Sequence, residues 1–194
     1  SLGADVTLLA RREDALREAV AALPTNGTQR HRYLIADVSQ KQALADAVAG
    51  LVATKPVHIL VNNTGGPPGG TAHGADVAAY LDAFNRHLVA NHTLMQAALP
   101  GMRDAGWGRI VNVISTSVYE PIPNLGVSNT VRGAVASWAK TLSRELGGDG
   151  ITVNNVLPGY TRTQRLDQIL ADRSKATGKS QDDVASGMLA TVPA

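Results

Sequence analysis

Two patterns of apolar residues alternate along this chain of 194 residues. Short, nearly continuous apolar runs rich in β-branched residues predict buried strands, and they lie at 6–10, 33–35, 58–61, 110–114 and 151–157. Runs in which apolar residues recur every three or four positions predict amphipathic helices, and they lie at 12–23, 42–52, 77–102 and 131–142. Strands that alternate with helices imply a parallel sheet with right-handed crossovers. The predicted fold class is therefore α/β, with a doubly wound parallel sheet flanked by helices.

Composition narrows the class of protein further. With 44% apolar residues, the chain is expected to form a single globular domain over residues 1–194. The net charge of +2 and the dispersed Lys and Arg residues disfavour nucleic acid as a partner. No apolar run approaches the roughly 18 residues of a membrane span, so no membrane partner is expected. The absence of cysteine excludes disulfides and thiolate metal sites, and no metal is expected. A chain without disulfides fits a cytoplasmic protein, so a cytoplasmic location is predicted.

The stretch from Gly108 to Leu146 places a strand, a loop and a long helix around one hydroxyl group. The apolar run at 110–114 ends at Ser115. Open α/β sheets bind ligands at the carboxyl ends of their strands, so a small polar residue at this position is a candidate functional group. The alternative is that Ser115 only caps the end of the strand.

Four motifs carry a resemblance to a known family. They are ADV at 36–38, HILVNNTG at 58–65, GRIVNVIS at 108–115 and GITVNNVLPGYTRT at 150–163. In order and spacing they resemble the short-chain dehydrogenases/reductases over nearly the whole chain, which implies a Rossmann-like fold and a catalytic role for Ser115. The resemblance also implies a set of cofactor-binding residues at the strand ends, namely Asp37, Val38, Asn62, Asn63, Gly65, Pro158, Gly159 and Thr163. For Asn62, Asn63 and Gly65 the alternative is a simple tight turn.

Two elements of the family's fold have no counterpart in the chain. The Gly-rich turn that holds the pyrophosphate would precede the first predicted strand, and the family's last strand would follow the last one. The fold is therefore expected to be truncated at both ends, and the chain to be a fragment of a longer protein. The family's first strand lies between those at 6–10 and 58–61, so a gap of roughly 9–10 Å is expected in the sheet. The alternative is direct pairing across that gap.

The family's catalytic positions are altered in this chain. Its spacing, counted from Ser115, leads to Ser128 and Arg132, so that SNTVR stands where the family has YxxxK. Its helical asparagine, counted back from QAALPGM, falls at His87, with Asn91 one turn further on as the alternative match. The resemblance therefore implies a catalytic group in which the tyrosine and the lysine are both replaced.

These replacements change the available chemistry. Arg132 would also bind the cofactor's ribose, but it does not readily release a proton because its pKa lies above about 12. The Ser128 hydroxyl is a far weaker acid than a phenol of pKa about 10. Two other residues are candidate proton donors: Tyr119 on the loop after Ser115, and His87, which is expected to titrate near neutrality. The alternatives are a surface-packing aromatic for Tyr119 and an ordinary hydrogen-bonded helix residue for His87.

Arg11 bears on the choice of cofactor. It stands where NADP-preferring members carry a basic residue, and Ala10 stands where NAD-preferring members carry an acid, so NADP is favoured over NAD. The alternative is that Arg11 and Arg12 form a solvated pair at the start of a helix.

The resemblance implies an oxidoreductase that interconverts a small-molecule carbonyl and an alcohol by hydride transfer, with a 3-oxoacyl reductase as one example. The alternative function is a catalytically impaired protein that binds cofactor or serves as a scaffold. The resemblance also implies a homodimer or homotetramer, joined through a largely apolar two-fold surface on the helices that hold Asn91 and Trp138.

Overall fold

The computed structural model describes residues 3–190, apart from the side chains of residues 164 and 165. It divides into two compact units, Ser1–Val156 and Leu157–Ala194. The first unit holds every described strand, and the second holds helices α6 (Gln164–Thr177) and α7 (Gln181–Leu189). A single domain over residues 1–194 stays a prediction.

Parallel strand pairing confirms the predicted α/β class. β1 (Thr7–Ala10) pairs with β2 (Arg32–Ile35), and in a separate sheet β4 (Gly108–Val113) lies between β3 (Ile59–Asn62) and β5 (Ile151–Val156). No ladder joins β1 to β3 within residues 3–190. Direct pairing across the predicted gap is therefore not observed, and the width of the gap stays a prediction.

The helices of the first unit are α1 (Glu13–Ala21), α2 (Lys41–Thr54), α3 (Val77–Phe84), α4 (Ala90–Asp104) and α5 (Gly126–Glu145). The long helix predicted at 77–102 is interrupted by the π-helical turn Asn85–Val89, which joins α3 to α4. A π-helical turn contains one more residue than an α-helical turn, and the apolar periodicity does not reveal so short an insertion. None of the described helices is long and apolar enough to cross a membrane.

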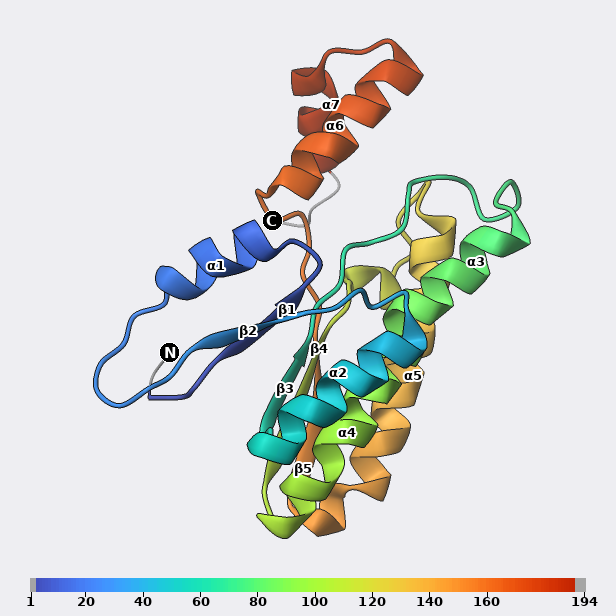
Figure 1. Ribbon diagram of the computed structural model, residues 1–194. Helices are drawn as coiled ribbons and strands as arrows, with labels where there is room; N and C mark the ends of the chain where they lie inside the picture. Colours follow the sequence, from blue (N-terminus) through green and yellow to red (C-terminus); the bar gives the residue numbers. More distant parts are fainter. Residues whose placement is uncertain (1–2, 191–194) are drawn as a thin grey trace. The chain divides into compact units, whose positions relative to one another are not determined.

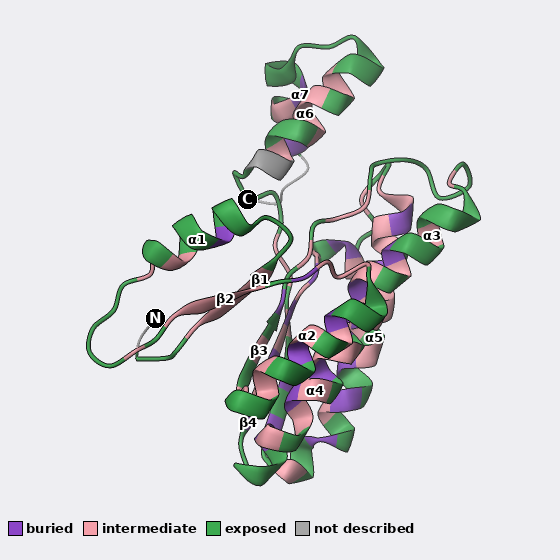
Figure 2. Ribbon diagram, viewed as in Figure 1, coloured by how far each residue is buried: buried purple, intermediate pink, exposed green. Residues whose placement is uncertain are grey.

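The core lies between one helical layer and the three-stranded sheet. Figure 1 shows α2, α4 and α5 on one side of β3, β4 and β5, and α1 on the opposite side of β1 and β2 from α2. Met102, Ile110 and Ile151 are almost completely buried where α4 meets β4 and β5. A second cluster, which includes Leu44 and Leu9, joins β1 and β2 to α2 and α4. Figure 2 shows the buried residues gathered along this helical layer.

β3 is less buried than predicted. Ile59 is 51% exposed and Val61 is 58% exposed, whereas Asn62 is 4% exposed. Side chains alternate between the two faces of a strand, and the helical layer covers only the face that carries Leu60 and Asn62.

The outer surface of α4 and α5 bears on the predicted self-association. Asn91 is 5% exposed, so its side chain faces the interior and not a partner. The residues that these helices expose are largely polar and include His92, Gln96, Lys140 and Thr141. The apolar self-association surface on these helices stays a prediction.

Candidate functional site

β4 leads directly to Ser115, as predicted. The Oγ of Ser115 accepts a hydrogen bond of 3.1 Å from the backbone N–H of Ser117 and caps the short 3₁₀ helix Thr116–Val118. The side chain is half-buried. A serine hydroxyl both donates and accepts, so Ser115 keeps its own proton available for a bound molecule. The capping alternative and the catalytic prediction are therefore compatible.

A row of asparagine side chains crosses the sheet at the carboxyl ends of its strands. Asn62 Nδ2 donates to Asn112 Oδ1 at 2.8 Å, and Asn112 Nδ2 donates to Asn155 Oδ1 at 3.1 Å. The three residues are register partners on β3, β4 and β5. The Oδ1 of Asn62 is buried and has no partner among the described residues. The side chain of Asn62 therefore stabilises the sheet beneath the site, while Asn63, the next residue, is exposed.

Arg132 reaches from α5 to the ends of β3 and β4. Its Nη1 donates to the backbone carbonyl of Val113 at 2.8 Å, and its Nη2 donates to that of Thr64 at 3.4 Å. No carboxylate pairs with this guanidinium in the part of the chain that the structure describes. Burial lowers the pKa of Arg132, but an arginine stays cationic at neutral pH. The strand ends therefore hold a cation without a counter-ion.

Ser128 lies one turn before Arg132 on α5, and residues four apart share one side of a helix. It is half-buried. The loop after β3 is fastened to the start of this helix, because Gly70 N donates to the Asn124 carbonyl at 2.8 Å and Gly126 N donates to the Gly70 carbonyl at 2.9 Å. A Cβ on Gly126 would overlap the backbone of the neighbouring loop. This close contact brings the loop and the helix end that carries Ser128 together.

His87 lies in the π-helical turn and is 2% exposed. Its Nδ1 lies 2.6 Å from the Oγ1 of Thr64. Burial, followed by the positive charges of Arg132 and Arg86, lowers the pKa of His87 to about 4, and the charge of Asp82 offsets only part of this effect. The imidazole is therefore neutral at pH 7. The expectation that His87 titrates near neutrality is wrong, and a neutral imidazole is not an effective general acid there.

Tyr119 lies at the end of the 3₁₀ helix that Ser115 caps and is 84% exposed. So high an exposure does not support the alternative that its ring packs on the surface. Its role as a proton donor stays a prediction.

Charged side chains gather at the ends of β1 and β2. The carboxylate of Asp37 accepts hydrogen bonds from the N–H and the hydroxyl of Ser39, at 2.9 and 2.8 Å, and these bonds lower its pKa. Arg11 Nη1 lies 3.9 Å from Asp37 Oδ2, and the Arg11 side chain is 68% exposed. Arg11 is therefore only weakly engaged and is available to an anionic ligand.

Val38, another of the predicted cofactor-binding residues, packs against the core cluster beneath α2.

Three of the predicted cofactor-binding residues, Pro158, Gly159 and Thr163, belong to the second unit. Thr163 directly precedes α6, and its hydroxyl donates to the carbonyl of Thr161 at 3.3 Å. Their contacts with a cofactor stay predictions.

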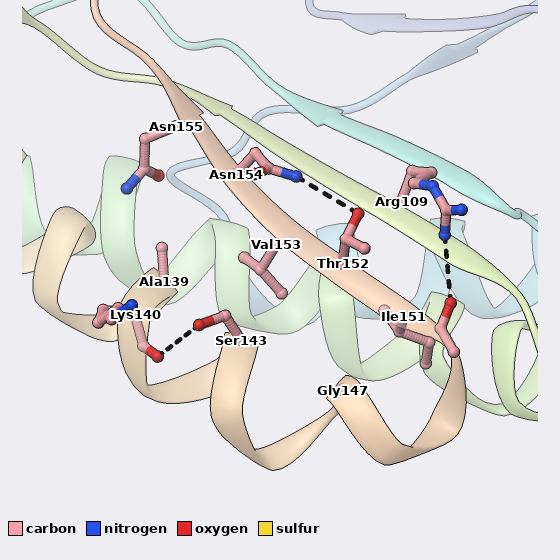
Figure 3. Close-up of a pocket in the computed structure, with 11 residues that line it drawn as sticks. Arg109, Ala139, Lys140, Ser143, Gly147, Ile151, Thr152, Val153, Asn154 and Asn155 are labelled. Atoms are coloured by element: carbon pink, nitrogen blue, oxygen red, sulfur yellow. Dashed lines mark hydrogen bonds between the residues drawn. The ribbon is translucent and has the colours of Figure 1, made fainter.

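A pocket of about 510 Å³ lies along the outer edge of β5, beside the second half of α5. Figure 3 shows Arg109, Lys140 and Ser143 around it together with residues 151–155 of β5. None of the candidate catalytic residues lines this pocket. The pocket therefore adjoins the asparagine row through Asn155 but includes none of the candidate catalytic groups.

Thr64 and Asn112 are not among the predicted site residues, although both take part in the site. For Thr64 the available signal was its position, since a hydroxyl directly after a buried strand lies where ligands bind. For Asn112 the signal was an amide inside an otherwise apolar strand, which requires a buried hydrogen-bond partner.

Comparisons with known proteins agree with the resemblance. Residues 1–174 match the family model described as short chain dehydrogenase. A Streptomyces coelicolor protein named as a ketoacyl reductase is 31% identical over 196 residues, which cover 98% of this chain and 74% of that protein. The chain spans 54–74% of the length of the first curated relatives that it matches.

Solved structures are similar over most of the chain. A variant of actinorhodin polyketide ketoreductase with NADPH superimposes with a TM-score of 0.88 at 29% identity, covering 99% of this chain and 74% of that one. L-Sorbose reductase from Gluconobacter frateurii, complexed with NADPH and L-sorbose, gives a TM-score of 0.83 at 28% identity, covering 94% and 70%.

Proposed function

Because the chain belongs to the short-chain dehydrogenase family, we propose that it is an NADP(H)-dependent oxidoreductase that interconverts a carbonyl and an alcohol. The observation that carries this proposal is the Arg132 guanidinium, which has no counter-ion among the described residues and binds the carbonyls at the ends of β3 and β4. Relatives named as ketoacyl reductases support a 3-oxoacyl type of substrate. The NADPH in two similar crystal structures supports NADP(H) as the cofactor.

The residues at the strand ends fit this cofactor. A Cβ built on Gly65 meets no atom within 4 Å, so the backbone after β3 is open to a ligand. Arg132 has further N–H donors beyond the two that bind carbonyls, and these suit ribose hydroxyls. Arg11 would bind the 2′-phosphate and Asp37 would lie near the adenine. When bound, the cofactor would supply or accept the hydride.

Ser115 and Tyr119 would serve the substrate. The free proton of the Ser115 hydroxyl would hydrogen-bond the carbonyl oxygen and stabilise the negative charge that develops there. Since His87 is neutral and Ser128 is a weak acid, the exposed phenol of Tyr119 is the proton donor that we propose.

NADPH fluorescence, measured with and without a panel of carbonyl compounds that includes a 3-oxoacyl thioester, tests the proposal. The full-length protein is expected to bind NADPH and to oxidise it when a carbonyl is added. A protein that binds NADPH but reduces no carbonyl would instead be a cofactor-binding or scaffold protein. Sedimentation of the same sample tests the homodimer or homotetramer that we propose by analogy with the family.

A further inference from the structure

Three elements meet at Thr64, the second residue after β3. His87 comes from the π-helical turn and fixes the Thr64 side chain through the hydrogen bond of 2.6 Å between Nδ1 and Oγ1. Arg132 comes from α5 and fixes the Thr64 backbone carbonyl at 3.4 Å. The same guanidinium binds the carbonyl of Val113 at 2.8 Å, so Arg132 also ties the end of β4 to the three elements that meet at Thr64.

His87 is suited to hold a hydroxyl at this position. A neutral imidazole has one donor and one acceptor nitrogen, whereas an imidazolium has two donors and no acceptor. The charged groups that act on His87 are Arg132 from α5, Arg86 from its own turn and Asp82 from α3, and two of the three are cations. These surroundings and the near-complete burial of the ring keep an acceptor nitrogen available beside Thr64.

We propose that Thr64 is a positioning residue and that Thr64, His87 and Arg132 act together as a brace. The brace fixes the backbone between Thr64 and Gly65, where the open space beside Gly65 would admit the cofactor. π-Helical turns occur frequently at functional sites, and here such a turn supplies His87. The inference rests on the proposed function at one point only, namely that the molecule positioned beside Gly65 is NADP(H).

The first test examines the brace without any cofactor. The chain contains five histidines, and the ring signals of His87 can be identified in an NMR spectrum by their loss in His87→Asn. In the full-length protein, Thr64→Val is expected to shift the His87 ring signals at pH 7 and to leave the other histidines unchanged. Arg132→Met is expected to raise the pH at which His87 titrates, because of the two nearby arginines Arg132 lowers the pKa of His87 more. If neither variant changes the His87 signals, the brace does not exist.

The second test measures the dissociation constant for NADPH by fluorescence titration. Thr64→Val keeps the shape of the side chain and removes its hydroxyl, and it is expected to weaken NADPH binding by about 3- to 10-fold, the usual contribution of one hydrogen bond. Thr64→Ser restores the hydroxyl and is expected to restore the affinity. If Thr64→Val does not fold, Thr64→Ala makes the same comparison.

Thr93→Val is the matched control. It removes a threonine hydroxyl that donates to the carbonyl of Val89, the last residue of the π-helical turn, at 2.9 Å, and is expected to leave NADPH binding unchanged because this hydroxyl has no part in the contact between His87 and Thr64. Parent affinity in Thr64→Val, or an equal loss in Thr93→Val, would overturn the positioning role. A parent that binds no NADPH would reject the proposed function, and the NMR test would still decide whether the brace exists.

Discussion

The two ends of the candidate site differ in how much protein surrounds them. At the ends of β1 and β2, Arg11 is 68% exposed and meets Asp37 only at 3.9 Å. At the ends of β3 and β4, His87 is 2% exposed and Arg132 binds backbone carbonyls. Exposed ion pairs contribute little to stability, whereas a buried polar group that loses its partner is costly. Substitutions are therefore expected to change ligand preference at the exposed end, and activity and stability at the buried end.

The largest effect is expected from restoring the family's catalytic pair at the buried end. Ser128→Tyr combined with Arg132→Lys supplies a phenol and a nearby cation that lowers its pKa. Activity toward a simple activated ketone is expected to rise, because the restored phenol is better placed than the exposed Tyr119, and the gain is limited to the roughly 10²–10⁴-fold that a general acid contributes. Steady-state kcat with NADPH measures this gain.

Two further variants sharpen that result. Ser128→Tyr alone is expected to gain less, because the planar head of Arg132 differs in shape and reach from an ammonium group. Tyr119→Phe is expected to lower the activity of the parent. Adding Ser128→Tyr and Arg132→Lys to Tyr119→Phe is expected to restore that activity. A double variant that binds NADPH normally and gains no activity would show that the buried end has lost more than its acid.

The next largest effect is expected from Ser115→Ala. Loss of one donor to a developing oxyanion typically lowers kcat by about 10²–10³-fold, and NADPH affinity is expected to stay near that of the parent. Ser117→Ala is the control, since the neighbouring Ser117 hydroxyl is buried without a partner among the described residues and its backbone N–H is kept. An equal loss of kcat in both variants would assign the effect to local structure instead of chemistry.

A smaller effect is expected in the pH dependence of stability. The pKa of His87 is about 4 in the folded protein and 6.5 ordinarily, so between these values the unfolded chain binds the proton more readily. The contribution of His87 is fully present above pH 6.5 and is lost as the pH falls toward 4, amounting to about 2 kcal/mol by pH 5. Urea unfolding at pH 7 and pH 5 measures this loss.

His87→Asn is expected to reduce the difference between the two pH values by about that amount. His73→Asn, which changes an exposed loop histidine, is expected to leave the difference as in the parent. The same pH dependence in the parent and His87→Asn would mean that His87 is charged, or solvated, in the folded protein.

The sequence predicted the exposed end of the site more fully than the buried end. The strands and the positions of Arg11 and Asp37 follow from local patterns, because apolar runs and the polar residues that end them are contiguous in the chain; at the buried end the same pattern reveals only Ser115. The partnership of Thr64 with His87 joins residues 23 positions apart. It depends on a π-helical turn that leaves no mark in the apolar periodicity, and the pKa of His87 depends on burial that only the folded chain provides.

The smallest effect is expected at the exposed end, from Arg11→Asp. The change removes a cation whose ion pair with Asp37 is long and exposed, so stability is expected to change little. It also places a carboxylate where a 2′-phosphate would bind, and the loss of one charge-assisted hydrogen bond should weaken NADPH binding by about tenfold. NADH lacks that phosphate, so its affinity should be retained and the preference for NADPH should narrow or reverse.

Arg12→Asp is the matched control, because the guanidinium of the neighbouring Arg12 is held by Asp14 at 2.6 Å, and its substitution is expected to leave the preference unchanged. Fluorescence titration of both cofactors measures the preference, and equal affinities for NADPH and NADH in the parent would refute the role assigned to Arg11.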